Sequence, residues 1–449
     1  MLARVKKLYI KLLVLILSAI TISVYLSALS YSIVLLMFIF LFFCAFFFYE
    51  IKKYGQLLTL GNVFNVYWFF YTSAFWINYQ LGFNREYELD LFYFMTIFSI
   101  INFFVFHLAY SFGFHVKEYK FTVNENFFSI VIPFIVIVAA ITLLYEIYII
   151  FIEIGIDRFI NVSRPQRSAL YLELGVLPFS DILILLSTIC FAIAQLYKSR
   201  FVKVLFLLLF MNNIAYSFVI IDRSTMLKVI LPILFISLVF KKISTRIVVF
   251  IAFVGFFYMM FFKELMSSII YSHPLNIAQF KINGEFERWY LVGLDVINDL
   301  NSGRLEMLYG RSYWDTLYNL IVPFTNVEPL SVWYVREYYP EVYEAGGGLA
   351  FSSIVEGIMN FGLIGPVLYF FFLGFICRFI NKRSFYDFKY FVLYSLVLTV
   401  VYKFFRAESY SLFKTTYWLW FLPLFLLFFV SNRIAMMMKT RNKDFSRKF

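Results

Sequence analysis

The sequence predicts an all-α polytopic membrane protein with about twelve transmembrane helices and one large external loop. Hydrophobic residues make up 62% of the 449 residues and charged residues only 15%, whereas a soluble domain is usually about 45–50% apolar and about 25% charged. About twelve apolar runs approach the roughly 20 residues that cross the hydrocarbon of a bilayer. Residues 263–352 contain no such run, and they form the expected loop.

The apolar runs divide the chain into three parts. Residues 1–262 are expected to hold nine helices, with a smaller external loop at 153–180. The large loop follows at 263–352, and residues 353–449 hold three more helices and a basic tail. The expected helices are 8–28, 30–49, 58–82, 90–114, 127–152, 181–197, 202–221, 225–240, 247–263, 353–377, 389–404 and 413–430.

The distribution of charge predicts the orientation. Twelve spans place both termini on the same side. If that side is the cytoplasm, its segments hold most of the Lys and Arg residues, including the basic tail from Arg433 to Lys448, as the positive-inside rule requires. The net charge of +12 therefore comes from helix ends and not from one basic patch, which argues against a nucleic-acid partner. The three cysteines lie in apolar runs, so neither a disulfide framework nor a metal-ligand spacing is indicated.

The large loop is too apolar for a free soluble domain. Its apolar residues include Trp289, Trp314 and Trp333. We expect short amphipathic helices that lie on the external membrane face. One such helix is clearly indicated, because apolar or small residues recur at the spacing of one helix face. Its members are Phe286, Trp289, Tyr290, Gly293, Ile297 and Leu300.

Arginines in the external segments run against the positive-inside trend. Guanidinium groups bind phosphate oxygens bidentately and keep their charge, so together they could bind an anion. For any single one, the alternative is a solvated loop charge or a snorkelling anchor. They are Arg158, Arg164, Arg167, Arg223, Arg288, Arg304, Arg311, Arg336 and Arg406.

Arg223 gives the clearest anion-site prediction. It lies in a short external turn immediately before the expected helix 225–240. The N-terminus of that helix would present free N–H groups and the positive end of its dipole on the same side. Lys228 lies about one turn further along. The alternative interpretation is a hairpin arginine that pairs with Asp222.

Glu356 is the candidate carboxylate. The pattern Ser353-Ile-Val-Glu356 opens the helix after the large loop and matches a capping box. Glu356 could therefore serve only as a cap. The functional alternative is a carboxylate at the membrane interface that orients an arginine or accepts a hydroxyl proton. The nearby glycines Gly357, Gly362 and Gly365 predict tight helix packing.

Three stretches resemble the Wzy-type O-antigen polymerases, also described as oligosaccharide repeat-unit polymerases. The first runs from Gly347 to Gly365 and contains Ser, Glu356 and Asn360-Phe-Gly-x-x-Gly. The second is Ile221-Asp-Arg-Ser-Thr, and the third is Gly310-Arg-Ser-Tyr with a following Ile321-Val-Pro. The expected topology is also similar. An arginine followed after ten residues by glycine occurs once in each external loop, at Arg164–Gly175 and at Arg336–Gly347.

The resemblance implies a membrane-embedded lipid-carrier glycosyltransferase of the bacterial inner membrane, with a GT-C-like architecture and both termini in the cytoplasm. A growing glycan on undecaprenyl pyrophosphate would be transferred en bloc to the non-reducing-end hydroxyl of an incoming lipid-linked repeat unit. No metal, nucleotide sugar or other cofactor is expected. The implied partners are undecaprenyl-pyrophosphate-linked glycans, membrane lipids, and a chain-length regulator and flippase of the same pathway.

The resemblance also implies roles for individual residues. Glu356, Arg223 and Arg336 would be catalytic, and Glu356 or Glu173 would accept the proton. Stabilisation of the departing pyrophosphate by cations suits a site without histidine or metal. The implied pyrophosphate ligands are Arg223, Lys228, Arg288, Arg311, Arg336 and Arg406. The implied sugar ligands are Arg164, Glu173, Trp289, Trp314 and Trp333.

Two other functions stay open. O-antigen ligases commonly carry a histidine near the position of Ser352 or Ser353, and the serines here favour a polymerase. Flippases usually lack a long late loop and place charges inside their helices, whereas the expected helix interiors here are nearly free of charge. The sugars, the linkage and the choice between O-antigen and capsule cannot be read from the sequence.

Overall fold

The structure is a computed structural model. It describes residues 31–83, 89–111, 119, 125–155, 180–197, 199–219, 223–255, 286–322, 328–344, 348–349 and 351–446, some of them at helix ends by backbone alone. The expected first helix (8–28) and nearly all of the smaller loop (153–180) lie outside these residues.

The described residues are almost entirely helical and contain no strand. Among them, seven helical stretches are long and apolar enough to cross a membrane, and three shorter apolar helices lie at Asp181–Leu196, Ser224–Val239 and Thr245–Gly255. The chain is therefore a membrane-embedded helical protein, as the composition predicted. The seven stretches are Tyr31–Tyr54, Leu89–Ser111, Phe128–Ile154, Arg200–Ser217, Ile364–Ser384, Phe388–Arg406 and Ser409–Met437.

The helices of the first half are α2 (Tyr31–Tyr54), α3 (Leu60–Gln80), α4 (Leu89–Ser111), α5 (Glu125–Tyr148) with the π-helix η1 (Ile149–Ile154), α8 (Ser180–Leu196), α9 (Arg200–Val219) and α10 (Arg223–Val239). Four short helices follow: α12 (Arg288–Asn301), α13 (Arg311–Ile321), α14 (Leu330–Tyr338) and α15 (Pro340–Glu344). The last part contains α16 (Ser353–Phe361), α17 (Ile364–Ser384), α18 (Phe388–Val397), η3 (Leu398–Val400), α19 (Lys403–Arg406), α20 (Ser409–Lys414), η4 (Thr415–Phe421) and α21 (Leu422–Ser446).

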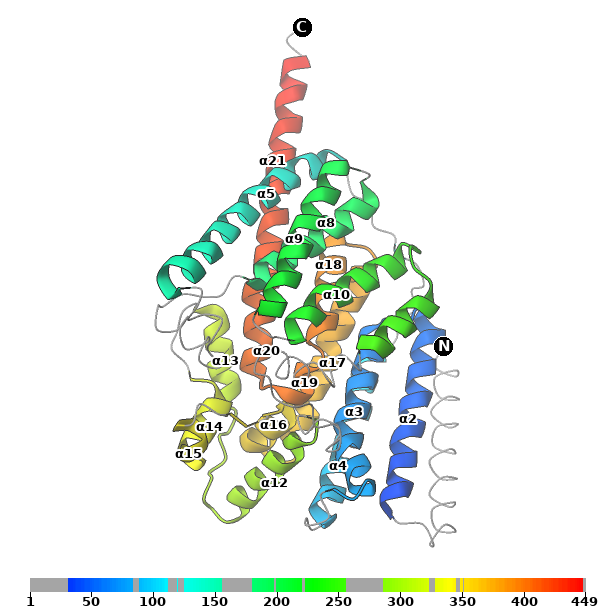
Figure 1. The fold of residues 1–449 in the computed structure, drawn as a ribbon, viewed down its shortest axis with the longest axis vertical. Coiled ribbons are helices and arrows are strands. Elements are labelled where there is room, and N and C mark those ends of the chain that lie inside the picture. Colours follow the sequence, from blue (N-terminus) through cyan, green and yellow to red (C-terminus); the bar gives the residue numbers. More distant parts are fainter. Residues whose placement is uncertain are drawn as a thin grey trace.

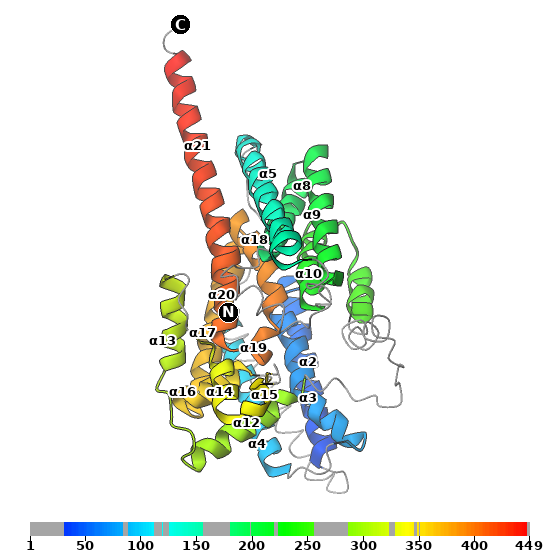
Figure 2. The same ribbon diagram turned by 60° about the vertical axis from the view of Figure 1, so that its left-hand side comes forward.

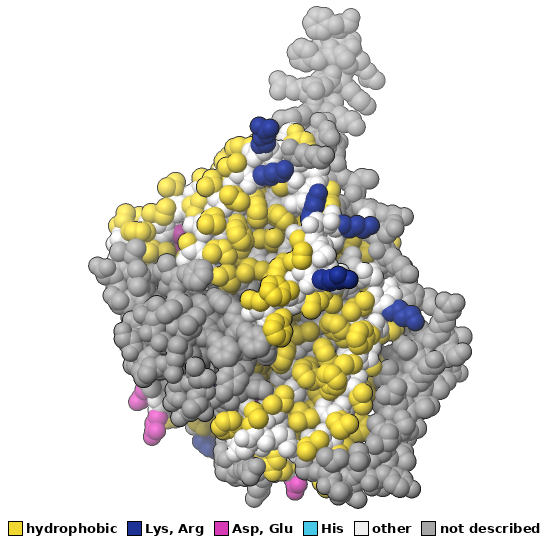
Figure 3. Space-filling model, turned by 45° about the vertical axis from the view of Figure 1, so that its right-hand side comes forward, with side chains coloured by type: hydrophobic (Ala, Val, Ile, Leu, Met, Phe, Trp, Pro, Cys, Tyr) yellow, Lys and Arg dark blue, Asp and Glu magenta, His cyan; other side chains and the backbone are white. Residues whose placement is uncertain are grey.

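The long helices form a bundle with distinct ends. Helices α12, α14, α15 and α16 gather at one end, and α21 projects from the other (Figures 1 and 2). Hydrophobic side chains dominate the face in Figure 3, and most of the visible Lys and Arg side chains lie towards the end with α21. This separation agrees with a basic cytoplasmic end and an opposite end that carries the large loop.

The bundle core is held by close helix packing and aromatic rings. Helix α17 lies against α4 at Gly374, where a Cβ atom would come within 2.5 Å of the Phe106 carbonyl oxygen. The rings of Phe64 and Phe106 stack at 3.7 Å. The interior is not free of charge, because Glu50 is fully buried in α2, near hydroxyls of Thr59 and Ser111.

Helix α12 joins the loop helices to the bundle. The Trp289 indole donates to the Tyr71 carbonyl (2.9 Å) and the Tyr290 hydroxyl to the Thr72 carbonyl (3.0 Å). Gly293 faces Met95, whose methyl carbon would lie 2.5 Å from a Cβ atom there. The amphipathic helix that the sequence predicted is confirmed, and its apolar face packs on α3, α4 and α16.

The expected helix 353–377 is wrong in one respect, because the chain turns within it. Helix α16 ends at Phe361, Gly362 adopts a φ of +58°, and α17 begins at Ile364. A Cβ atom on Gly365 would lie 1.9 Å from the Gly357 carbonyl oxygen. The predicted tight packing is thus confirmed for Gly357 and Gly365, whereas Gly362 serves the turn, where its positive φ favours glycine.

Candidate functional site

A cavity of about 310 Å³ lies where the loop helices meet the bundle. Helices α13, α14, α16 and α20 supply its walls, so the segment 308–356 meets the start of the last helical stretch there. The lining residues are Leu308, Arg311, Ser312, Asp315, Thr316, Glu328, Pro329, Leu330, Trp333, Glu356, Glu408 and Tyr410.

Glu356 is buried at the cavity wall and bridges α13 and α20. Its Oε1 accepts from the Ser312 hydroxyl (2.8 Å) and the Ser409 hydroxyl (2.7 Å), and its Oε2 accepts from the Ser409 backbone N–H (2.6 Å). Burial raises the pKa of the Glu356 carboxyl, and the hydrogen bonds from Ser409 and Ser312 oppose that rise. The site therefore holds a carboxylate in a dry environment with fixed donors around it.

Glu356 does not cap α16. The N-cap is Ser352, whose hydroxyl accepts from the Val355 N–H at 3.2 Å. The Ser353 hydroxyl donates instead to the Ala407 carbonyl (3.0 Å). Because the Glu356 carboxylate points to α13 and α20 and not back to the cap, the capping-box interpretation is wrong.

Hydroxyl and amide groups fix the orientation of the donors. The Asn360 side-chain amide donates to the Ser312 hydroxyl (2.7 Å) and to the Glu356 carbonyl (2.8 Å). The hydroxyls of Thr316 and Ser409 lie 3.1 Å apart. Ser312 receives a hydrogen bond from Asn360, so its own proton is directed at the Glu356 carboxylate.

Glu408 is a second buried carboxyl at the same cavity, which the sequence analysis missed. Its oxygens accept from the backbone N–H (2.6 Å) and the hydroxyl (3.0 Å) of Ser331 at the start of α14. Burial first, and then the charge of Glu356, raise the pKa of Glu408 to about 7. A signal existed, because Arg406 and Glu408 are charged residues in the short gap between the last two apolar runs.

The arginines of the loop helices do not converge. Arg336 is half-exposed, and its guanidinium donates to Glu328 (2.7 and 2.8 Å) and to Glu337 (2.9 and 3.1 Å). Arg311 lines the cavity with a largely exposed side chain, 4.0 Å from Asp315. Arg288 is exposed on α12. Of the arginines whose side chains the structure describes, only Arg311 lines the cavity directly.

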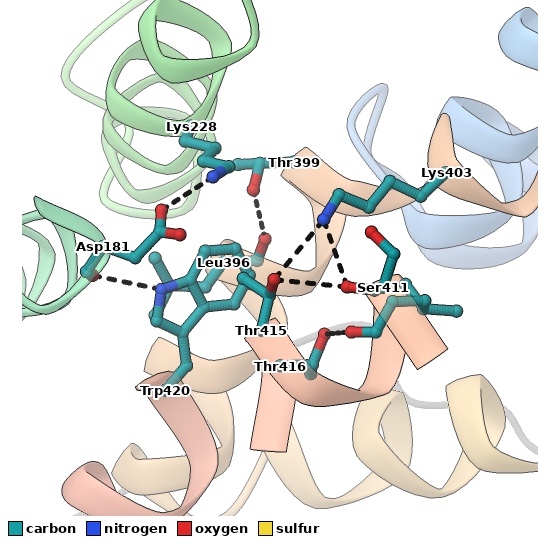
Figure 4. A network of polar contacts seen from close by, with 10 residues as sticks. Asp181, Lys228, Leu396, Thr399, Lys403, Ser411, Thr415, Thr416 and Trp420 are labelled. Atoms are coloured by element: carbon teal, nitrogen blue, oxygen red, sulfur yellow. Dashed lines mark hydrogen bonds and ion pairs between the residues drawn. The ribbon is translucent and has the colours of Figure 1, made fainter. Parts of the chain in front are cut away.

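The expected anion site on α10 is partly described. Arg223 begins α10, but its side chain lies outside the described residues. The Lys228 ammonium is 2.7 Å from Asp181 of α8, so its charge is already paired (Figure 4). In the same network, Lys403 donates to the Ser411 carbonyl (3.2 Å) and the Thr415 hydroxyl (3.4 Å). Arg406 ends α19, two residues before Glu408.

The three candidate tryptophans have different surroundings. Trp333 lines the cavity, Trp314 is exposed on α13, and Trp289 is buried between α12 and α3. Trp289 therefore has no free face on which a sugar could stack, which argues against its implied role. The remaining implied residues, Arg164 and Glu173, lie outside the described residues.

The cavity is acidic. Among the described residues, Asp315, Glu328, Glu356 and Glu408 line it together with one cation, Arg311, and Glu328 is paired with Arg336. The described residues include no group of three or more His, Cys, Asp or Glu side chains arranged to hold a metal ion. Carboxylates accept hydrogen bonds from hydroxyl groups, and aromatic rings pack on apolar faces. This lining suits a hydroxyl-rich ligand better than a free anion. No protein-family model, characterised protein or solved structure matches this chain.

Proposed function

We propose that this chain is a glycosyltransferase that polymerises lipid-linked oligosaccharide repeat units at the non-cytoplasmic face of a bacterial inner membrane. The donor would be a glycan on undecaprenyl pyrophosphate, transferred en bloc to an acceptor repeat unit on the same kind of carrier. Twelve spans, a GT-C-like architecture and cytoplasmic termini belong to this proposal. The observation that carries it is the cavity beside the apolar spans, with two buried carboxyls and the Trp333 ring on its wall.

In the proposed reaction, the acceptor hydroxyl lies in the cavity. Its oxygen forms the new bond to the anomeric carbon of the donor, the bond from that carbon to the pyrophosphate oxygen breaks, and the pyrophosphate leaves with the electron pair. The hydroxyl proton passes to Glu356. The donors from Ser312 and Ser409 hold that carboxylate in place, and burial raises its pKa towards the range in which a general base is effective.

Glu408 and Trp333 supply the acceptor contacts. A Glu408 carboxyl with a pKa of about 7 is partly protonated near neutral pH, so it can donate a hydrogen bond to a sugar oxygen or accept one from a hydroxyl. The Trp333 ring offers an apolar surface for a sugar face. The acidic lining makes this cavity the place for the acceptor, and the pyrophosphate of the donor would need the cations Arg223, Arg311 and Arg406.

The experiment is deletion of the gene in the bacterium that carries it, followed by return of the wild type, Glu356→Gln or the exposed control Glu341→Gln. The proposal expects surface glycan of one repeat unit in the deletion strain and with Glu356→Gln, and full-length chains with Glu341→Gln. Full-length polymer that stays on the lipid carrier would identify a ligase instead. Lipid-linked single units retained on the cytoplasmic face would identify a flippase.

A further inference from the structure

Helix α13 has its polar and apolar faces the opposite way round from a helix in water. The polar side chains of Ser312 and Thr316 are buried against the bundle. On the other side, Trp314, Leu317 and Ile321 are exposed at 68%, 45% and 70% of their surface. A surface helix of a soluble protein turns its apolar stripe to the core, so the outer face of α13 differs from that of a helix that faces water.

The neighbouring helix α12 does not share the inversion. Helix α12 buries Trp289, Tyr290 and Val296 and exposes Arg288 and Asn298. Exposing a large apolar side chain to water forgoes about 1.5–3 kcal/mol relative to burial. Several such residues on one short helix would make the arrangement of α13 unstable unless something apolar covers them.

Hydrogen bonds fix the rotation of α13 about its axis. The Ser312 hydroxyl donates to Glu356 (2.8 Å), the Thr316 hydroxyl lies 3.1 Å from that of Ser409, and the Trp418 indole donates to the Asn319 carbonyl (3.1 Å). Turning the apolar face inwards would break these contacts and remove the Ser312 donor of Glu356, so that only the two donors of Ser409 would remain. The exposed apolar face is thus a consequence of building the cavity.

The position of α13 along the bundle places it beside membrane spans. At its start, a Cβ atom on Gly310 would lie 2.6 Å from the Phe361 ring, and the candidate span Ile364–Ser384 begins after the short turn that follows Phe361. Thr316 is level with Ser409, the first residue of the span Ser409–Met437. At a rise of about 1.5 Å per residue, the chain from there to Val322 runs about 9 Å further along the bundle. Figures 1 and 2 both show α13 upright beside α20.

The distribution of charge along α13 agrees with a position at the edge of the membrane spans. Arg311 and Asp315 lie in the first half of α13, and no charged residue follows up to Val322. Trp314 and Tyr318 are aromatic residues of the kind that gather at membrane interfaces. On α20, the Lys414 ammonium turns back to the Tyr410 hydroxyl (2.9 Å), as expected of a lysine that keeps its charge near the interface.

We propose that α13 is a membrane-inserted helix whose exposed face lies among the lipid acyl chains of the leaflet at this end of the bundle. The apolar surface is continuous with the start of α17, where Leu363 and Ile364 are exposed, and that span faces lipid. The cavity behind α13 is then separated from lipid by one helix. A ligand attached to a lipid could reach it from the leaflet. The insertion of α13 does not depend on the reaction proposed above.

The test uses spin labels on the full chain in lipid nanodiscs of phosphatidylethanolamine and phosphatidylglycerol. Cys44, Cys190 and Cys377 are replaced by alanine, and single labels are attached at Leu317→Cys, Ile321→Cys and the α12 control Asn298→Cys. Collisions with oxygen, which concentrates in lipid, are compared with collisions with a water-soluble nickel chelate. We expect oxygen to dominate at both α13 positions and the chelate to dominate at Asn298→Cys.

Two results would overturn the proposal. Strong collisions with the nickel chelate at Leu317→Cys and Ile321→Cys would mean that α13 faces water. Labels protected from both reagents would mean that protein covers the face. A second measurement needs no cysteine replacement: brominated lipid should quench a component of the tryptophan fluorescence of the wild type that is missing in Trp314→Phe, and equal quenching of the two proteins would contradict lipid contact.

Discussion

Replacing Glu408 by glutamine should make the protein more stable than the wild type at pH 8 and slightly less stable at pH 4. The pKa of Glu408 is about 7 in the folded chain, against an ordinary value of 4.5. The folded state therefore holds this proton more tightly than the unfolded state does. The resulting stabilisation is fully present below about pH 4.5 and is lost as the pH rises through about 7.

The size of the effect follows from the shift. One pKa unit corresponds to about 1.4 kcal/mol, so the wild type should lose about 3 kcal/mol through this group between pH 4.5 and pH 8. Glutamine has no charge to bury, and it keeps one acceptor for Ser331. The lost second hydrogen bond costs about 1 kcal/mol at every pH. The variant should therefore lie about 1 kcal/mol below the wild type at pH 4 and about 2 kcal/mol above it at pH 8.

The assay is thermal unfolding in detergent from pH 4 to pH 8.5 for the wild type, Glu408→Gln and the exposed control Glu341→Gln. The difference in Tm between the proteins is compared, so that groups distant from Glu408, which titrate alike in all three proteins, largely cancel. The apparent Tm values of the wild type and Glu408→Gln should cross. Parallel curves across the whole range would refute the inferred burial of a titrating Glu408, and a crossing for Glu341→Gln would show that the effect is not specific.

Four further outcomes are expected. Glu356→Gln should reduce glycan chain extension at least 100-fold, the usual contribution of a general base, with unchanged membrane levels; extension at the wild-type rate would exclude Glu356 as the base. Trp333→Ala should lower acceptor affinity by about 1 kcal/mol in titrations of KM, with less effect on kcat. Arg223→Ala should abolish extension at normal protein level, and unchanged chain length would remove Arg223 from the site. Gly365→Ala should lower the yield of folded protein, because its Cβ atom would lie 1.9 Å from the Gly357 carbonyl oxygen, whereas Gly348→Ala, with nothing within 4 Å, should fold normally.

Hydropathy predicted the membrane-embedded helical fold because an apolar run of about 20 residues is typical of a membrane-spanning helix. It could not predict the turn between α16 and α17. That turn depends on the positive φ of one residue, Gly362. A hydropathy average over a window of about 20 residues does not detect a single residue. The same averaging hid the start of the last span, which lies at Ser409 and not at 413.

Three of the site residues expected from the sequence, Arg311, Trp333 and Glu356, line the cavity, whereas the contacts around them could not be predicted. The capping-box pattern drew attention to Glu356, although its partners Ser312 and Ser409 come from stretches that only the fold brings together. The three tryptophans Trp289, Trp314 and Trp333 look alike in sequence, and only packing separates a core residue from an exposed one and from a cavity wall. Arg336, which the sequence suggested as a ligand of the pyrophosphate, forms a local ion pair with Glu328 instead.

The short helix α20 connects the acidic cavity with the lysine network behind it. Its first residues, Ser409 and Tyr410, face the cavity, whereas the Ser411 carbonyl accepts a hydrogen bond from Lys403. The proposed transfer needs a carboxylate at the acceptor hydroxyl and a cation at the departing pyrophosphate. An acidic cavity cannot serve both. The π-helix η4, which follows α20 directly, is a feature frequent at functional sites. In the displacement proposed above, the acceptor oxygen and the pyrophosphate oxygen lie on opposite sides of the anomeric carbon, so the cations that bind the pyrophosphate would have to lie at the edge of the cavity, where Arg311 is placed.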